Sequence, residues 1–233
     1  MEPDEKSPIM NIAQIVDWFT QPAQWSGPDG IPNRVAEHLY YSGLALLIAA
    51  VIALPLGLLI GHTGRAGFLV VNSGTAARAL PTLGLVGLAV VVWGIGLVPT
   101  LVPLVALAVP PILVNTYEGI RQVDAELKDA AKGVGMTGPE VLFRVELPVA
   151  LPLIILGLRT AAIQIVSTAT IAAYVGLGGL GRYIFDGLAR REYDVMVGGA
   201  VLAVVLALLT EAAFAVLARL TVAPGVRQRA TTQ

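Results

Sequence analysis

Five long apolar runs, separated by short polar segments, fill most of the chain. Each run is long enough to cross roughly 30 Å of hydrocarbon as a helix. The runs cover residues 39–60, 68–93, 98–117, 148–175 and 195–217. This pattern predicts an all-α fold, an integral membrane bundle of about five transmembrane helices.

The second run is the least regular of the five, because it contains Arg78 and Pro81. A proline inside a helix removes one backbone hydrogen bond, and its ring crowds the preceding turn. We therefore expect the helix over 68–93 to be bent or split.

The segments outside the runs divide the chain into three parts. Residues 1–38 form a predicted extramembrane or interfacial segment, residues 39–220 one transmembrane domain, and residues 221–233 a short cytoplasmic tail. Between residues 9 and 19, apolar positions recur at helical spacing. This stripe fits either a helix in the headgroup region or a plain juxtamembrane connection.

Composition supports the membrane assignment and excludes several kinds of chemistry. The chain is 56% hydrophobic and 13% charged, whereas soluble domains are about a quarter charged. Its net charge of −1 disfavours a nucleic-acid partner, which normally requires a basic surface. There are no cysteines and only two histidines, far apart in sequence, so neither thiolate chemistry nor a metal site is expected.

A charged segment at 121–147 interrupts the apolar pattern. Asp124 is placed to cap a helix, and apolar residues then recur at the spacing of one helical face. Gly133 and Gly135 should weaken and end that helix. Thr137 and Glu140 have the spacing of a capping box for a second short helix, which Leu147 and Pro148 should join to the next span.

This segment also carries the motif of a known family. The motif consists of Asp129-Ala130-Ala131, Gly135 after three further residues, Val145 after nine more, and Leu147-Pro148. It resembles the EAA loop of ATP-binding cassette importer permeases. Asp129 stands where the family usually has Glu, and Val145 where it usually has Ile; both changes preserve charge or apolar character.

Other stretches extend the resemblance to roughly residues 39–217. They are similar to the branch of these permeases that imports glycine betaine, choline, carnitine or proline. The matching stretches are Ala79-Leu80-Pro81-Thr82-Leu83-Gly84, Pro110-Pro111-Ile112, and Ala172-Ala173-Tyr174 followed by the glycine-rich residues 175–181.

The resemblance implies a set of partners. It implies a second permease copy or paralogue, two cytoplasmic ATPases that bind ATP and Mg²⁺, a separate extracytoplasmic substrate-binding protein, and surrounding lipid. This chain has no Walker lysine motif and is expected to hold no cofactor and to be no enzyme itself. The loop at 121–147 would sit in a groove of the ATPase and pass its rigid-body motion through Pro148 to the fourth span.

Orientation follows from the basic residues. With the loop at 121–147 in the cytoplasm, the larger share of Lys and Arg lies on that side, as inner-membrane proteins prefer. An odd number of spans then places the N-terminus outside and the C-terminus in the cytoplasm.

Charged and polar residues within the spans are candidates for a pathway or gate. Arg159 and Glu211 are predicted to form an ion pair, because an unpaired charge in the membrane costs at least a few kcal/mol. That pair would either fix helix packing or line the pathway, and Gln164 and Thr170 are further candidates for a polar lining. The complete candidate set is Arg78, Pro81, Thr82, Arg159, Ser167, Thr168 and Glu211.

Residues 176–181 match the pattern G-x-G-x-x-G. That pattern binds nucleotides only between a strand and a helix, and here a membrane helix precedes it. We interpret it as a flexible outer turn, acting as a gate or a receptor contact.

Three alternative functions stay open at this stage. The importer could carry another amino acid, such as methionine. An ion-coupled secondary transporter would show inverted repeats and several acids at mid-membrane, whereas Glu211 is the only such acid and no repeat is visible. A membrane-embedded enzyme would need clustered carboxylates or histidines, which the sequence does not show.

Overall fold

The computed structural model describes residues 12–221 except 69, 71, 73 and 75–80. Within that part of the chain the regular structure is helical, without strands. Four segments in it are long and apolar enough to span a membrane. They are α2 (Ile31–Thr63), α5 (Leu97–Arg121), the continuous helical stretch Gly138–Val175 that contains α8 (Leu147–Thr168), and α10 (Tyr193–Thr221).

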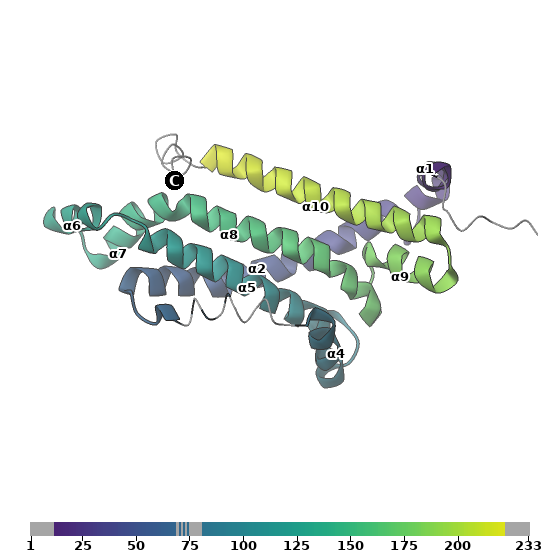
Figure 1. Ribbon diagram of the computed structural model, residues 1–233, viewed down its shortest axis with the longest axis horizontal. Coiled ribbons are helices and arrows are strands. Elements are labelled where there is room, and N and C mark those ends of the chain that lie inside the picture. Colours follow the sequence, from purple (N-terminus) through teal and green to yellow (C-terminus); the bar gives the residue numbers. More distant parts are fainter. Residues whose placement is uncertain (1–11, 69, 71, 73, 75–80, 222–233) are drawn as a thin grey trace, which may run out of the picture.

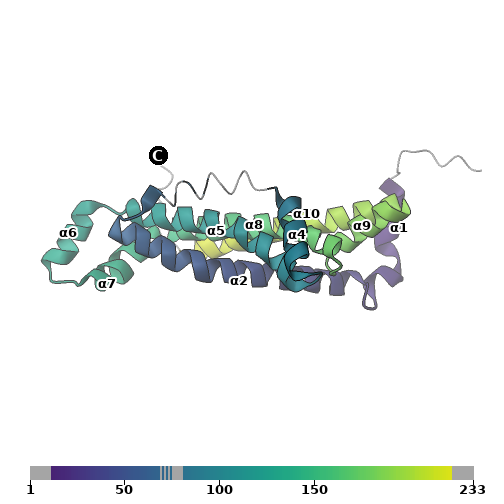
Figure 2. The same cartoon turned by 90° about the horizontal axis from the view of Figure 1, so that it is seen from below.

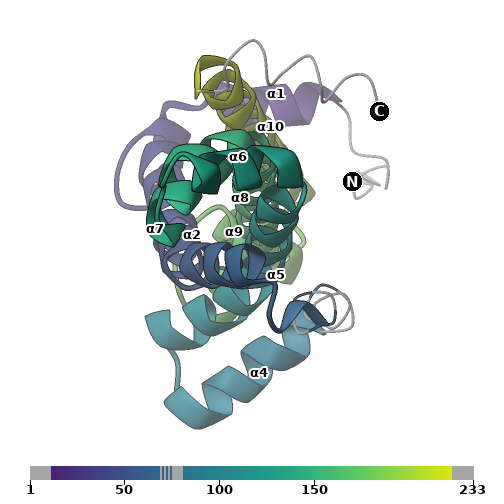
Figure 3. The same ribbon diagram turned by 90° about the vertical axis from the view of Figure 1, so that its left-hand side faces the viewer.

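The four long segments lie side by side in an elongated bundle (Figures 1 and 2). One end carries α6 (Ala125–Gly133) and α7 (Gly138–Val141), and the opposite end carries α1 (Ile12–Thr20) and α9 (Gly181–Arg190). Figure 3 looks onto the end formed by α6 and α7. The polar elements are thus collected at the two ends, where a membrane protein meets water.

The predicted span over 68–93 is described only in part. Residues 68, 70, 72 and 74 are helical, and α4 (Thr82–Trp93), 12 residues long, follows Pro81. At 1.5 Å per residue α4 alone is too short to cross the hydrocarbon, and a fifth span over 68–93 stays a prediction. The expected interruption at Pro81 is confirmed, because Pro81 is extended and α4 begins directly after it. α4 projects from the side of the bundle (Figure 3).

Small residues bring α2 and α5 into close contact. Ala45, Ala49 and Ala53 lie at four-residue intervals on one face of α2 and are completely buried. Further along that face, a Cβ on Gly61 would lie 2.7 Å from the Cβ of Ile120 on α5. Helices in lipid gain stability from such close packing, since the hydrophobic effect does not drive them together.

The junction to the fourth span lies where it was predicted, because α8 begins at Leu147 with Pro148 in its first turn. The sequence did not predict how the helix before it continues. α7 passes through a π-helical turn, Leu142–Glu146, directly into α8. The Leu147 N–H bonds the carbonyl of Leu142 in this wide turn. The wider turn fits here because Pro148 has no N–H to donate and its ring needs room beside the preceding turn.

At the other end of the bundle, the N-terminal helix is fixed to the core. Trp18 of α1 is 2% exposed and contacts Phe19 and Tyr183 edge to face. Its ring also lies against Gly198 of α10, where a Cβ would overlap it. The predicted helical stripe between residues 9 and 19 therefore includes a helix packed on the bundle. A 3₁₀ turn, Pro22–Trp25, leads from α1 towards α2.

Candidate functional site

The loop between α5 and α8 has the local structure predicted for it. The Asp124 carboxylate accepts a hydrogen bond of 3.0 Å from the Glu126 N–H and so caps α6. α6 ends at Gly133, and Gly135 follows with φ +89°. Only glycine adopts such a backbone without strain. The predicted caps and the glycine ending are confirmed.

A second start signal opens α7. The carboxylate of Glu140 accepts hydrogen bonds of 2.9 Å from both the N–H and the hydroxyl of Thr137. These bonds pair donors at the beginning of the helix that would otherwise be unsatisfied. The two caps give the loop a fixed shape that does not depend on an external partner.

The loop exposes apolar surface to solvent. Leu127 is 45% exposed and Val134 is 79% exposed, so the described residues leave the predicted apolar face of α6 uncovered except around buried Ala131. Phe143 is also exposed. A self-capped loop with uncovered apolar residues has the character of a docking surface.

The motif residues occupy different depths of this surface. Asp129, Ala130 and Gly135 are exposed on the protruding part, whereas Ala131 is buried. Val145 and Leu147 are half-buried, and Pro148 is exposed at the start of α8.

Beneath the loop lies a buried carboxylate that the sequence analysis missed. Glu146 is 2% exposed and contacts His62 and Lys128. Its only sequence signal was its position between motif residues Val145 and Leu147, among apolar neighbours.

The predicted ion pair between the fourth and fifth apolar runs is present. The Nε of Arg159 on α8 donates a hydrogen bond of 2.7 Å to Glu211 Oε2 on α10, and Arg159 Nη2 contacts the other carboxylate oxygen. Each side chain is about one-third exposed in the single chain. Two charges at membrane depth therefore neutralise each other.

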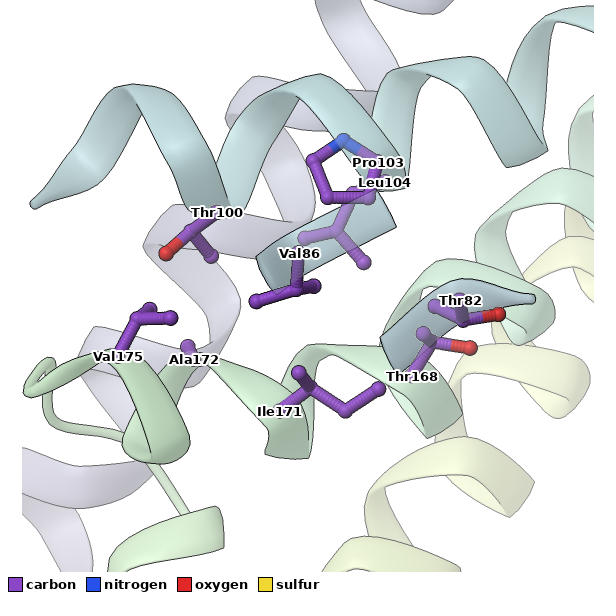
Figure 4. Close-up of a pocket in the computed structure, with 9 residues that line it drawn as sticks. All are labelled: Thr82, Val86, Thr100, Pro103, Leu104, Thr168, Ile171, Ala172 and Val175. Atoms are coloured by element: carbon purple, nitrogen blue, oxygen red, sulfur yellow. The ribbon is translucent and has the colours of Figure 1, made fainter. Parts of the chain in front are cut away.

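The remaining pathway candidates lie on two sides of α8. Thr82 and Thr168 meet in a small pocket between α4, α5 and the end of α8, where Figure 4 shows their side chains next to each other. Ser167 and Glu211 instead line an open groove between α8, α9 and α10. Pro81 is exposed at the start of α4 and Gln164 is exposed on α8. Arg78 lies outside the described residues.

The pocket of Figure 4 is mostly lined by methyl groups. The described residues that form its walls include no aromatic and no charged side chain, and its free space fits about one water molecule. The lining residues are Thr82, Val86, Thr100, Pro103, Leu104, Thr168, Ile171, Ala172 and Val175.

The turn at 176–181 is held in place, which corrects its interpretation as flexible. The Gly179 N–H donates a hydrogen bond of 2.7 Å to Glu37 Oε2, and the Leu180 N–H donates one of 3.4 Å to His38 Nδ1. His38 is completely buried, and its Nε2 lies 2.8 Å from the carbonyl oxygen of Val166. We call Glu37 and His38 the glycine-turn clamp.

The geometry of the clamp defines the tautomer of His38. A carbonyl oxygen can only accept, so Nε2 must carry the proton, and Nδ1 is then free to accept from Leu180. Both ring nitrogens are thereby satisfied without a charge. The sequence analysis missed this role, because a lone histidine before a span carries no motif.

A neighbouring tyrosine strengthens the same end of the bundle. Tyr183 donates a hydrogen bond of 2.6 Å to the carbonyl of Asp29. Burial raises the pKa of Tyr183 to about 12, so the phenol keeps its proton and continues to donate.

Comparison with known proteins identifies the family of the chain. Residues 53–227 match the family model described as "Binding-protein-dependent transport system inner membrane component". That match covers well over half of the sequence. The chain belongs to this permease family.

Curated relatives of the permease include proteins of Bacillus subtilis, Listeria monocytogenes and Salmonella typhimurium. It is 38% identical over 186 residues to the glycine betaine/carnitine/choline transport system permease protein OpuCB of Bacillus subtilis, covering 80% of this chain and 86% of the relative. It is 37% identical to the choline transport system permease protein OpuBB of the same organism, with the same coverage.

Solved structures confirm the architecture of the permease. It superposes with a TM-score of 0.69 and 27% identity on a chain of the inward-facing MetNI methionine ABC transporter, covering 82% of this chain and 95% of the other. It also superposes on a chain of an amino acid ABC transporter with a TM-score of 0.66 at 17% identity, a likeness of fold alone. The all-α membrane fold and the permease family predicted from sequence are confirmed.

Proposed function

We propose that this permease forms the membrane path of an ATP-driven importer of osmoprotectants such as glycine betaine, choline, carnitine or proline. The cargo class is supported by the names of the relatives. The mode of action rests on one observation, the self-capped loop that protrudes from the bundle with Leu127 and Val134 uncovered. In the complete transporter, a cytoplasmic ATPase covers this surface.

The continuous helix from α7 to α8 supplies the route for force. An ATPase that closes on ATP shifts α6 and α7, and the shift enters α8 without an intervening joint. Domain closure of this kind moves rigid helices against one another and alternates access to the two sides. ATP and Mg²⁺ are bound by the ATPase, and this chain supplies no catalytic group.

The path itself runs between two permeases. The pocket of Figure 4 fits about one water molecule and holds neither an aromatic ring nor a carboxylate for a quaternary ammonium group. Thr82 and Thr168 instead provide hydroxyls that a partner permease completes into a wider channel. Selection of the cargo then belongs to a separate extracytoplasmic receptor.

The experiment is reconstitution of the permease in vesicles with its candidate ATPase and receptor. We expect uptake of radiolabelled glycine betaine or choline that needs ATP, the ATPase and the receptor together. Uptake driven by an ion gradient without the ATPase would refute the proposal in favour of a secondary transporter. Uptake of methionine and not of quaternary ammonium compounds would instead favour the cargo of the structurally similar MetNI transporter.

Orientation can be tested independently. Because the sequence contains no cysteine, a single cysteine at Lys132 or at Gly27 provides a specific label. In cells, an impermeant maleimide should label position 27 and leave position 132 unlabelled until the membrane is opened. The reverse pattern would place the loop outside and exclude contact with a cytoplasmic ATPase.

A further inference from the structure

The buried carboxylate of Glu146 joins several helices at the base of the loop. Its Oε2 lies 2.5 Å from His62 Nδ1, and its Oε1 lies 3.1 Å from Lys128 Nζ. Both oxygens are therefore engaged with nitrogen donors. We call Glu146, His62 and Lys128 the Glu146 clasp.

Each member of the clasp comes from a different helical element. His62 lies in the last turn of α2, Lys128 in α6, and Glu146 at the end of the π turn that enters α8. Lys128 also donates a hydrogen bond of 3.0 Å to the carbonyl of Ile120 in the last turn of α5. The other side of the His62 ring faces Gly138, the first residue of α7.

Few other contacts hold α6 to the bundle. Within the helix only Ala131 is buried, and the chain enters it next to buried Val123. On the far side, α6 is followed by Gly135 at positive φ, where an added Cβ would meet no atom within 4 Å. Without the clasp, α6 could swivel about these two ends while α8 stayed in place.

Separating one member of the Glu146 clasp from the other two is energetically unfavourable. A carboxylate removed from water is costly unless opposite charges and hydrogen bonds compensate it, and removing one partner of a buried pair leaves the other charge uncompensated. Tilting α6 alone would carry Lys128 away from Glu146 and incur such a cost. Motion of α6 together with α2 and α8 leaves every contact intact.

We propose that Glu146 is a positioning residue that makes the α6 helix, α2 and α8 move as one unit when the ATPase acts. The inference rests on the proposed function, since it assumes that force enters at α6. It adds to the continuous helix from α7 to α8 a second connection, in which one buried carboxylate transmits force from α6 to α2 and α8.

The test uses the full transporter reconstituted with ATPase and receptor, and measures cargo transported per ATP hydrolysed. Glu146→Gln and Lys128→Met should still co-purify with the ATPase, because the exposed face of α6 is unchanged, but their transport per ATP should fall at least severalfold. Glu118→Gln, the same carboxylate-to-amide change on α5 outside the clasp, should keep the wild-type ratio.

His62 provides a conservative rescue. The amide nitrogen of an asparagine at this position can occupy the place of Nδ1 and donate to Glu146. His62→Asn should therefore retain most of the coupling that His62→Leu loses. A structural role alone would affect melting temperature in both variants but not the ratio of transport to hydrolysis.

The outcomes separate the two proposals. A wild-type complex that neither binds the ATPase nor transports would remove the proposed function itself. A wild-type complex that works, with an unchanged ratio in Glu146→Gln and Lys128→Met, would overturn the role of the clasp. Loss of ATPase binding or of folding in both variants would also overturn it, because Glu146 would then only stabilise the loop.

Discussion

Substitutions at Gly135 test whether the shape of the loop matters for binding the ATPase. The space around this residue would accept a side chain, whereas its backbone conformation disfavours one. A Cβ at this position would meet no atom within 4 Å, so the free permease has space for a larger side chain. The backbone, at φ +89°, does not favour one. Within this chain, the cost of substitution is therefore conformational rather than steric.

The expected series is Gly135→Asn, Gly135→Ala and Gly135→Val. Strained backbone positions of this kind cost on the order of 1–3 kcal/mol, with Asn tolerated best and β-branched residues worst. We expect a small effect for Asn, about 1 kcal/mol for Ala and towards 3 kcal/mol for Val. If this free energy reduces the population of the loop conformation that binds the ATPase, the apparent affinity falls by up to about fivefold for Gly135→Ala and up to about 150-fold for Gly135→Val.

The assay is titration of the detergent-solubilised permease with its ATPase, with circular dichroism to verify that the bundle is folded. Asn binding almost as well as Gly, with Ala and Val progressively worse, would support the conformational reasoning. Asn binding as poorly as Val would refute it, because side-chain size would then matter and the limiting contact would be steric contact with the ATPase. Equal binding by all three would show that the left-handed turn is not needed.

Three further predictions concern the membrane helices and the end of the bundle that carries α9. Arg159→Met should lower the melting temperature more than the double variant with Glu211→Leu, since only the single change leaves a charge unpaired; additive losses would exclude coupling. Gly178→Ala should displace the clamp carboxylate, with which its Cβ would overlap, and cost about 1–3 kcal/mol by thermal unfolding. Gly61→Ala should destabilise the permease by overpacking the seam with α5, whereas Gly43→Ala, with open space around it, should be neutral or stabilising by about 0.5–1 kcal/mol; equal effects would refute the close approach.

Features written in local sequence could be predicted. The caps at Asp124 and Thr137 depend on residues within three positions of each other, and the helix ending at Gly135 on one glycine. The pairing of Arg159 with Glu211 followed from the scarcity of charge in the spans. In each case the pattern leaves few physical alternatives.

Features created by packing between distant segments could not be predicted from the sequence. The polar contacts of His38 join it to a carbonyl 128 positions away, and those of Glu146 reach a residue 84 positions away. Neither residue has a local partner to reveal it. The π turn before Leu147-Pro148 was not predicted for a different reason, because a proline normally marks the start of a new helix and here the wider turn accommodates it within a continuous one.

The two histidines of the sequence have related positions. His38 binds the Val166 carbonyl near one end of α8, and His62 binds Glu146 just before the other end. α2 and α8 are thus joined by a hydrogen bond near each end, and sliding or separating the two helices would break at least one of these bonds. In the proposed importer, the distance between a spin label on α2 and one on α8 should stay constant throughout the ATP cycle. In the proposed importer, we therefore expect opening and closing to occur mainly between the two permeases rather than between α2 and α8.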